Sequence, residues 1–276
     1  MENVDLHCHS RSSDGLLAPA ELVRRARQFG VTTLALTDHD DTSGLEEAAD
    51  SARESGLRFV PGVEISATWE GITVHVLGLG IDPGNVQLVR GLQWVRSGRS
   101  RRASQIADGL AAAGIQGSLE GAMEYAQNPD LISRTHFGRF LVDRGYARDF
   151  RSVFQKYLVS GKPGYVAHQW AELGDALDWI RGAGGVAILA HPARYKINRK
   201  QMRRLLAEFS DQGGLGLEVM TATHTADECG TFAALAQEFG MLASRGSDFH
   251  APGESRFELG ALPALPDGLK PVWEQL

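Results

Sequence analysis

The apolar positions in the first third of the chain switch between a strand period of two and a helix period of 3.6. Strand and helix patterns alternate over the segments 4–7, 19–29, 33–37 and 45–54. Gly30 and Gly56 follow the two helical patterns, in the position where glycine commonly ends a helix. Segments 58–66 and 72–79 then both show strand patterns, joined by a turn at 69–71. The order predicts a βαβα start followed by a hairpin.

The same alternation resumes in the last third of the chain. Helical patterns cover 171–182, 199–209 and 226–239, and strand patterns cover 186–190, 216–219 and 241–244. About six strands in parallel-type units, together with the hairpin, predict an α/β fold in which the sheet is a closed or distorted barrel.

The middle of the chain has a different pattern. Residues 99–165 have apolar positions at helical spacing, an excess of arginine and no strong strand pattern. We therefore expect a barrel built from residues 1–98 and 166–276, with 99–165 as a mainly helical inserted sub-domain. Because both ends of the insertion adjoin barrel elements, it should cover one rim of the barrel as a lid.

Composition narrows the class of protein. With 276 residues and 43% hydrophobic content, the chain can bury a large core. A net charge of −6 argues against binding along duplex DNA, whereas a small anionic substrate stays open. Cys8 and Cys229 are the only cysteines, so no disulfide framework is implied and we expect a cytoplasmic protein. No apolar run approaches the ~18 residues of a membrane span, so we expect no membrane partner.

Histidines and carboxylates gather in five short segments that follow or end apolar runs. In an extended chain, side chains i and i+2 point the same way, so His7 pairs with His9 and Asp248 with His250. Ends of several strands meet at one rim of an α/β barrel. The pattern therefore predicts a multinuclear metal site, built from the segments Asp5–His9, Thr37–Asp40, Gly62–Glu64, Ala190–Pro192 and Gly246–His250.

These five segments resemble the motifs of the polymerase and histidinol phosphatase (PHP) superfamily. Ile132–His136, within the helical insertion, resembles the bacterial branch of nucleoside 3′,5′-bisphosphate phosphatases and 5′-to-3′ exoribonucleases. The resemblance implies a distorted (β/α)7 barrel with three divalent metal ions, manganese first, with iron or zinc as alternatives. It implies three ligand sets, which are His7, His9, Glu64 and Asp248; Glu64, His75 and His191; and Asp14, His39 and His250.

The ligand count agrees with this assignment, although two of the positions would also suit a structural role. Six histidines and three carboxylates give roughly three protein ligands per ion and leave positions open for water and substrate. The mixed donor set suits manganese, iron or zinc without choosing among them. Asp14 could be a turn residue before Gly15, and His75 could face the core, but we expect both to be ligands. We expect Asp40 and Asp41 to cap or support rather than to bind metal.

A group of cationic and polar residues predicts a phosphate site near the metals. Ser133, Arg134 and His136 open a predicted helix, whose free N–H groups attract anions. Lys162 lies in a Gly-Lys-Pro-Gly turn that returns to the barrel, and Arg194 follows His191 by three residues. We expect all five cationic or polar side chains of this group to contact substrate.

The resulting hypothesis is a phosphoesterase that removes the 3′-phosphate of nucleoside 3′,5′-bisphosphates. Asp248 and His191 are candidate catalytic residues as ligands. His224 is a candidate for substrate contact, and either His224 or a metal-bound water is the candidate general acid. We expect His168 to be a surface or helix-capping residue. The alternatives are a 5′-to-3′ exoribonuclease acting on short 5′-phosphorylated RNA, a small-molecule phosphatase of histidinol-phosphatase type, and a non-enzymatic binding module. The last should lack some ligands, and this sequence lacks none of the nine.

Overall fold

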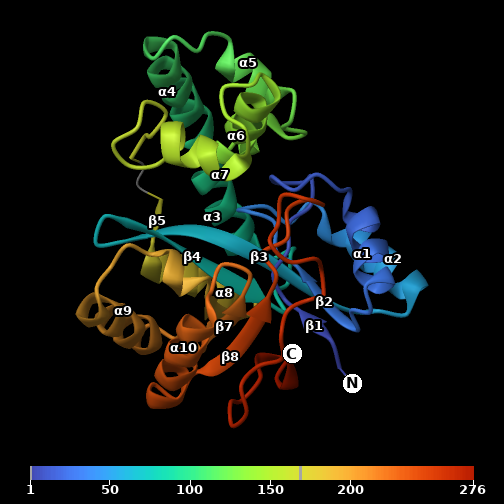
Figure 1. Ribbon diagram of the computed structural model, residues 1–276. Helices are drawn as coiled ribbons and strands as arrows, with labels where there is room; N and C mark the ends of the chain where they lie inside the picture. The colour runs from blue at the N-terminus through green and yellow to red at the C-terminus, as the bar shows by residue number, and fades with distance from the viewer. Residues whose placement is uncertain (1, 168–169) are drawn as a thin grey trace.

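The computed structural model describes residues 2–167 and 170–276 and contains a nearly closed barrel (Figure 1). Leu6 N–H donates to the Arg245 carbonyl at 3.0 Å, which joins the last strand to the first. The predicted distorted (β/α)7 barrel is confirmed. Its strands follow the order β1 (Val4–Asp5), β2 (Thr33–Leu36), β3 (Arg58–Trp69), β4 (Ile72–Leu79), β6 (Val186–Leu189), β7 (Gly216–Thr221) and β8 (Leu242–Gly246).

The β3–β4 hairpin is where the barrel departs from parallel pairing. β4 runs antiparallel to both β3 and β6, whereas the other pairs along the barrel are parallel. The turn is Glu70–Gly71, with φ of 47° and 75°, so β3 extends three residues beyond the predicted end. Ala171 pairs with Ala67 as part of a short strand β5 (Ala171–Glu172), so the helix predicted from 171 begins two residues later.

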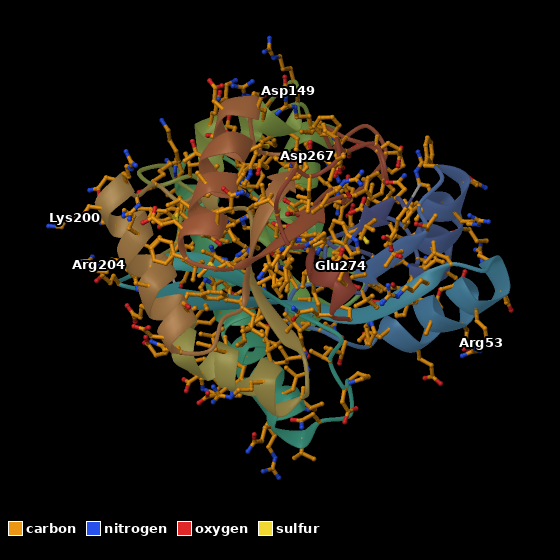
Figure 2. The ribbon with its side chains drawn as sticks, turned by 90° about the horizontal axis from the view of Figure 1, so that it is seen from below. Arg53, Asp149, Lys200, Arg204, Asp267 and Glu274 are labelled. Atoms are coloured by element: carbon orange, nitrogen blue, oxygen red, sulfur yellow. The ribbon has the colours of Figure 1, made fainter. Side chains whose placement is uncertain are left out.

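Helices surround the barrel strands and bury one apolar face each. In α1, for example, Leu22, Val23 and Ala26 are buried, while Arg24 is exposed. Charged side chains such as Arg53 and Lys200 point outward from the helices (Figure 2). These helices are α1 (Pro19–Gln28), α2 (Leu45–Ser55), α3 (Val86–Ser97), α8 (Leu173–Gly182), α9 (Arg199–Asp211) and α10 (Ala226–Glu238).

The middle of the chain forms helices that stand above one end of the barrel (Figure 1). Their buried side chains, including Ile106, Leu110, Phe137 and Leu158, form a hydrophobic cluster separate from the barrel core. The segment contains α4 (Arg99–Ala112), α5 (Ser118–Met123), a 3₁₀ turn (Pro129–Leu131), α6 (Arg134–Asp143), α7 (Phe150–Val153) and a π-helical turn (Phe154–Leu158). Two further 3₁₀ turns, Pro192–Arg194 and Val272–Glu274, belong to the barrel half.

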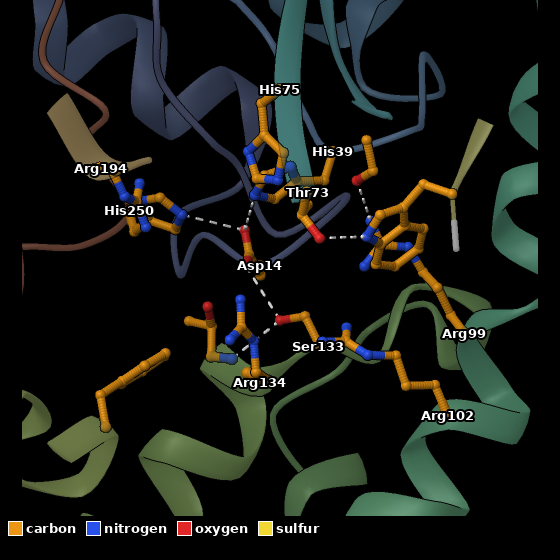
Figure 3. A pocket seen from close by; sticks show the side chains of 14 residues that line it. Asp14, His39, Thr73, His75, Arg99, Arg102, Ser133, Arg134, Arg194 and His250 are labelled. Atoms are coloured by element: carbon orange, nitrogen blue, oxygen red, sulfur yellow. Dashed lines mark hydrogen bonds and ion pairs between the residues drawn. The ribbon is translucent and has the colours of Figure 1, made fainter. Parts of the chain in front are cut away.

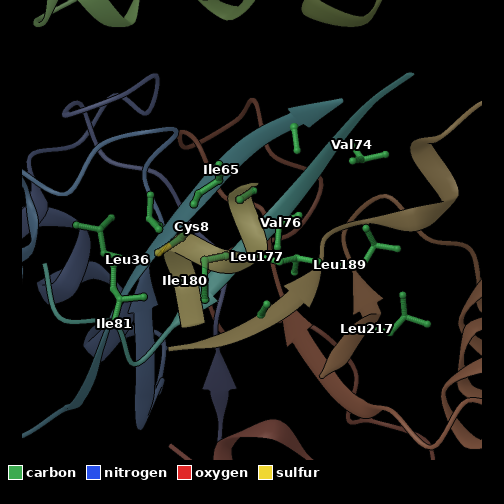
Figure 4. Packing of buried hydrophobic residues seen from close by; sticks show 14 of the residues in the cluster. Cys8, Leu36, Ile65, Val74, Val76, Ile81, Leu177, Ile180, Leu189 and Leu217 are labelled. Atoms are coloured by element: carbon green, nitrogen blue, oxygen red, sulfur yellow. The ribbon is translucent and has the colours of Figure 1, made fainter. Parts of the chain in front are cut away.

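The main core lies between the barrel sheet and its helices. Ile65 and Val76 of the hairpin, Leu189 of β6 and Leu177 of α8 are among its fully or almost fully buried members (Figure 4). Burying such side chains stabilises the fold by about 1.5–3 kcal/mol each. This core fixes the strand ends that carry the polar residues described next. None of the helices in the described ranges is long and apolar enough to cross a membrane.

Candidate metal centre

One rim of the barrel gathers all nine predicted metal ligands. His7 and His9 follow β1, His39 follows β2, and Asp248 and His250 follow β8. Cys8 and Phe249 form a parallel bridge, which sets the two ligand pairs on either side of it next to each other. The remaining ligands are Asp14, Glu64, His75 and His191, from the first loop, β3, β4 and the turn after β6.

Glu64 lies at the middle of the cluster. Its carboxylate oxygens are 2.7 Å from His75 Nδ1, 2.9 Å from His191 Nε2 and 3.0 Å from His39 Nδ1. His7 Nε2 and His9 Nε2 lie 3.2 and 3.3 Å away. A carboxylate surrounded by imidazoles in this way can serve as a metal ligand together with them.

The donor atoms fall into three groups, each compact enough for one ion. Within a group all ligand atoms lie within 4.8 Å of one another, and the groups are His7, His9, Glu64 and Asp248; His9, Asp14, His39 and His250; and His39, Glu64 and His75. The first equals the set implied by the resemblance. The second adds His9, and the third contains His39 where the resemblance implied His191. His191 nevertheless contacts Glu64 at 2.9 Å.

Orphaned polar atoms test whether these residues fit metal ions. Among the buried atoms without a hydrogen bond in the described residues are His9 Nδ1, Asp14 Oδ1, His39 Nδ1 and Glu64 Oε2, of which the last two lie 3.0 Å apart. Leaving a buried polar atom unsatisfied costs about 1–3 kcal/mol, so such atoms rarely cluster without a ligand. These four atoms lie together on predicted ligands, and His191 Nδ1, on a fifth predicted ligand, has no partner either. The residues present therefore fit a divalent-metal centre.

In the cluster, burial and the neighbouring charges shift the pKa of Glu64 in opposite directions. Burial alone would raise the pKa of Glu64, but the imidazoles of His39, His75 and His7 hold it well below its usual range. Burial, with Arg194 nearby, lowers the pKa of His191 to about 4. Glu64 is therefore a carboxylate and His191 a neutral imidazole, which are the forms that bind metal.

Glu218 supports the ligands and was not predicted. Its carboxylate accepts from His7 Nδ1 at 2.9 Å and from the His191 backbone N–H at 2.6 Å. This contact turns His7 Nε2 toward the cluster. Glu218 is fully buried in strand β7 between Leu217 and Val219, and an acidic residue inside a buried strand was the available signal.

Asp38 and Asp40 also support the site. Asp38 accepts hydrogen bonds from Ser10 N–H at 2.8 Å and Ser13 Oγ at 2.6 Å, and burial raises its pKa to about 6. Asp40 accepts from Ser66 N–H at 2.7 Å and forms an ion pair with Arg99. Both aspartates thus fix loops that carry ligands.

Left-handed backbone conformations occur at two candidate ligands. His191 has φ of 26° and Asp248 has φ of 52°, a region that non-glycine residues rarely adopt. Such conformations cost about 1–3 kcal/mol and occur where the surrounding structure holds a functional geometry. At His191 the Glu218 contact to the backbone N–H provides this restraint.

A cavity of about 90 Å³ opens between the metal ligands and the helical segment (Figure 3). Asp14, His39, His75 and His250 line its barrel side, where Ser133 Oγ donates to Asp14 at 3.1 Å. On the helical side the lining is cationic, with Arg99, Arg102 and Arg134, and Trp170 lies against Arg99 and Arg102.

Arg102 and Arg134 are the least neutralised of these cations. Arg102 Nε donates to the Val166 carbonyl at 3.3 Å and Arg134 to the Leu158 carbonyl at 3.3 Å, and neither has a carboxylate partner in the described ranges. Burial, with repulsion from Arg134 and Arg99, lowers the pKa of Arg102 to about 9. Both guanidinium groups are still charged at neutral pH, so this wall is suited to an anion.

Three of the five predicted phosphate contacts line the cavity. Ser133 and Arg134 do so from the start of α6, and Arg194 does so from the turn after β6. His136 is buried instead, with Nδ1 accepting from Ser133 N–H at 3.0 Å, and burial lowers its pKa to about 4. It caps α6 rather than facing the cavity. Lys162 is exposed and outside the lining.

His224, the predicted general acid, is buried with both ring nitrogens engaged by the backbone. Nδ1 contacts the Val219 carbonyl at 3.0 Å, and Nε2 accepts from Ala193 N–H at 3.3 Å. Its ring stacks on Phe232. This placement supports a structural role and offers no free nitrogen to a substrate. His168 lies outside the described residues.

A histidine and carboxylate cluster at strand ends of a barrel, facing a cation-lined cavity, defines a metal-dependent phosphoesterase. The chain belongs to the PHP domain family, whose model matches residues 5–222. It is 51% identical to a 3′,5′-nucleoside bisphosphate phosphatase of Chromobacterium violaceum, over 100% of this chain and 97% of the relative. The resemblance found in the sequence is therefore confirmed, and the chain is a phosphoric ester hydrolase.

Two further relatives fit the same assignment. The chain is 43% identical to the 5′-3′ exoribonuclease Rnm of Escherichia coli, over 98% of this chain and 92% of that protein. A solved Bifidobacterium adolescentis structure, assigned to the metal-dependent phosphoesterases, superposes with a TM-score of 0.83 at 27% identity. That match covers 98% of this chain and 93% of the solved chain.

Proposed function

We propose that the chain hydrolyses the 3′-phosphate of nucleoside 3′,5′-bisphosphates to give the 5′-monophosphate and inorganic phosphate. The observation that carries the proposal is a single cavity with two facing anion sites. One wall holds the candidate metal ligands, and the other holds Arg99, Arg102 and Arg134. A substrate with two phosphates on one ribose can place one phosphate against each wall. The named activity of the Chromobacterium violaceum relative supports it.

The nine ligands would hold three divalent ions, with manganese first and iron or zinc as alternatives. When bound, such ions lower the pKa of a water molecule to near neutrality and offset the charge that develops on a phosphoryl group. Asp248 and His191 act as ligands in this scheme. Because Cys8 and Cys229 are buried free thiols, we place the protein in a reducing cytoplasm.

The protein's own side chains orient the substrate. Arg134 and Arg102 hold the 5′-phosphate, which does not react, through charge-assisted hydrogen bonds. Arg194, whose guanidinium donates to Asp248 at 2.8 Å, lies at the cavity edge and fixes that ligand. Ser133 Oγ holds Asp14 on the facing wall. The 3′-phosphate is thereby directed to the metal side.

Short 5′-phosphorylated RNA is a second candidate substrate. Hydrolysis from its 5′ end breaks the same bond, between phosphorus and the 3′-oxygen of the first nucleoside. The Escherichia coli relative is named a 5′-3′ exoribonuclease, and the cavity adjoins a second, larger one. Both observations favour this activity in addition to the first.

A product assay tests the proposal. With Mn²⁺ present, adenosine 3′,5′-bisphosphate should give 5′-AMP and phosphate, and 3′-AMP alone should react more slowly because it lacks the held phosphate. If chromatography finds 3′-AMP as the main product, the 5′-phosphate is the one that reacts, and the proposed orientation of the substrate is contradicted. Equal rates on both substrates would favour a general phosphomonoesterase.

A further inference from the structure

A second cavity, of about 600 Å³, adjoins the first beside the candidate metal ligands. Thr135, Phe154, Arg194 and His250 line both cavities, so the two lie side by side. In the first cavity, His250 and Arg194 lie at one side and Arg99 and Arg102 at the other (Figure 3). The larger cavity therefore begins at the side away from Arg99 and Arg102.

The charge of this second cavity is positive. Its two acidic side chains are already paired, Asp248 with Arg194 at 2.8 Å and Glu254 with Arg139 at 2.9 Å. Arg151 is exposed at the cavity and has no ion pair within the described ranges. Among the same residues, Arg256 donates only to the backbone carbonyls of Ala222 and His224, at 3.3 and 3.4 Å, and its guanidinium lies over the Phe257 ring. Two cations thus remain free to contact an anion.

Aromatic rings complete the lining. Phe150 and Phe154 contact each other with ring centroids 5.2 Å apart, and both face the cavity from the end of the helical segment. Phe154 belongs to the π-helical turn, an irregularity often found at functional sites. Phenylalanine rings beside free arginines are the combination that binds single-stranded nucleic acid, because the bases stack and the phosphates pair.

We propose that this cavity binds the nucleotide that follows the scissile phosphate in a 5′-phosphorylated RNA. The proposal rests on the proposed function and extends it. The 5′-phosphate lies at Arg102 and Arg134, the scissile phosphate at the metal ligands, and the second nucleotide against Phe150, with its following phosphate at Arg151 and Arg256. This order gives the cleft a 5′-to-3′ direction.

The reaction on such an RNA balances without a further reactant. Water oxygen forms a bond to phosphorus, and the bond from phosphorus to the 3′-oxygen of the first nucleoside breaks. One water proton goes to that 3′-oxygen and the other to solvent. The products are a 5′-mononucleotide and an RNA one residue shorter that again carries a 5′-phosphate.

The test compares two substrates, adenosine 3′,5′-bisphosphate and the 5′-phosphorylated triadenylate pApApA. Arg151→Ala should lower the ratio of kcat/KM for the triadenylate to kcat/KM for the bisphosphate by about tenfold, because one phosphate contact is lost. Arg151→Glu should lower it further, and Arg151→Lys should restore most of it. Arg24→Ala, an exposed arginine on α1 that lines neither cavity, serves as the matched control.

A binding measurement provides a second readout that does not depend on turnover. With chelator present, fluorescence anisotropy of 3′-labelled pApApA should report weaker binding to Arg151→Glu than to Arg24→Ala. An unchanged kcat/KM ratio in Arg151→Glu overturns the proposal. Equal losses on both substrates also overturn it, since the cavity would then hold the base of the first nucleoside.

Failure of the proposed function has a different signature. A wild-type protein that leaves the bisphosphate intact but cleaves pApApA contradicts the bisphosphatase activity, and the anisotropy measurement on the Arg151 variants still tests the cavity. A wild-type protein that cleaves the bisphosphate and not pApApA supports the first activity and rejects the RNA subsite.

Discussion

At the scale of single residues, the candidate ligands and the supporting role of Asp40 were predictable from the sequence, whereas Glu218 was not. His7, His9, Asp248 and His250 follow from strand periodicity, because i and i+2 share a face. Glu218 was missed because its contacts to His7 and His191 come from a strand 211 and 27 residues away. A local sequence pattern carries no information about contacts between residues so far apart in the chain.

The arginine wall leads to a prediction about binding. Arg134→Ala should raise KM for the bisphosphate by about thirtyfold, equivalent to roughly 2 kcal/mol, because a charge-assisted contact to the unreactive 5′-phosphate is lost. Metal content should stay the same. Steady-state kinetics on bisphosphate and on 3′-AMP, which lacks the 5′-phosphate, provide the measurement. Equal loss on both substrates would mean that Arg134 does not hold this phosphate.

Glu218 leads to a prediction about metal affinity. Glu218→Gln keeps the shape but removes the charge that orients His7 and restrains the His191 backbone, so metal affinity should fall about 10- to 100-fold. Titration with Mn²⁺, followed by elemental analysis after dialysis, measures the change. Glu46→Gln, on the exposed face of α2, is the control. Identical titrations for the two variants would show that Glu218 has no such role.

At the scale of elements, most strands and helices were predictable, and α3 shows why one was not. Its buried face includes Leu88, Leu92 and Val95, but Gly91 interrupts the middle of the helix. A Cβ at Gly91 would lie 2.4 Å from the Trp179 ring of α8, so close packing requires the glycine. That packing partner is far away in the sequence, and a glycine alone weakens a helical pattern.

The start of α6 leads to a prediction about pH. Burial lowers the pKa of His136 to about 4, against the attraction of Asp14 and with repulsion from Arg139 and Arg99. The unfolded chain, with a histidine pKa near ~6.5, takes up the proton first as pH falls. Stability from His136 is therefore complete above about pH 6.5 and is lost toward pH 4, by up to about 1.4 kcal/mol per unit.

Urea unfolding of chelated protein between pH 7.5 and 5 measures this dependence. His136→Gln keeps a hydrogen-bond acceptor for the α6 cap without the titrating group. The difference in unfolding free energy between wild type and variant should therefore shrink as pH falls. Parallel curves for the two proteins would contradict a buried neutral His136.

At the scale of the whole molecule, the fold class and the rim that carries the site could be predicted, but the cavities could not. The family resemblance and the alternation of strand and helix patterns predicted the barrel. The polar residues at the strand ends predicted which rim of the barrel carries the site. The arginine wall depends on how the helical segment packs over Trp170, and Arg99 and Arg102 lie in α4 with Arg134 in α6. Contacts between distant elements of this kind are not encoded in local periodicity.

Three compact donor groups lead to a prediction about stoichiometry. Protein prepared with Mn²⁺ should hold close to three ions per chain by elemental analysis, because the three groups together use eight of the nine candidates and the ninth, His191, contacts Glu64. Chelation should abolish hydrolysis, and added Mn²⁺ should restore it. One ion per chain at saturation, or activity that survives chelation, would contradict the trinuclear centre.

The meeting of the first and last barrel strands also sets an order of events during synthesis on the ribosome. Two of the three donor groups need Asp248 or His250 as well as His7 or His9. A nascent chain that has not yet reached residue 248 can complete only the group of His39, Glu64 and His75, which His191 adjoins through Glu64. We therefore expect a translation product that stops before Asp248 to lack hydrolytic activity, because two of the three donor groups stay incomplete until this last ligand segment has been made.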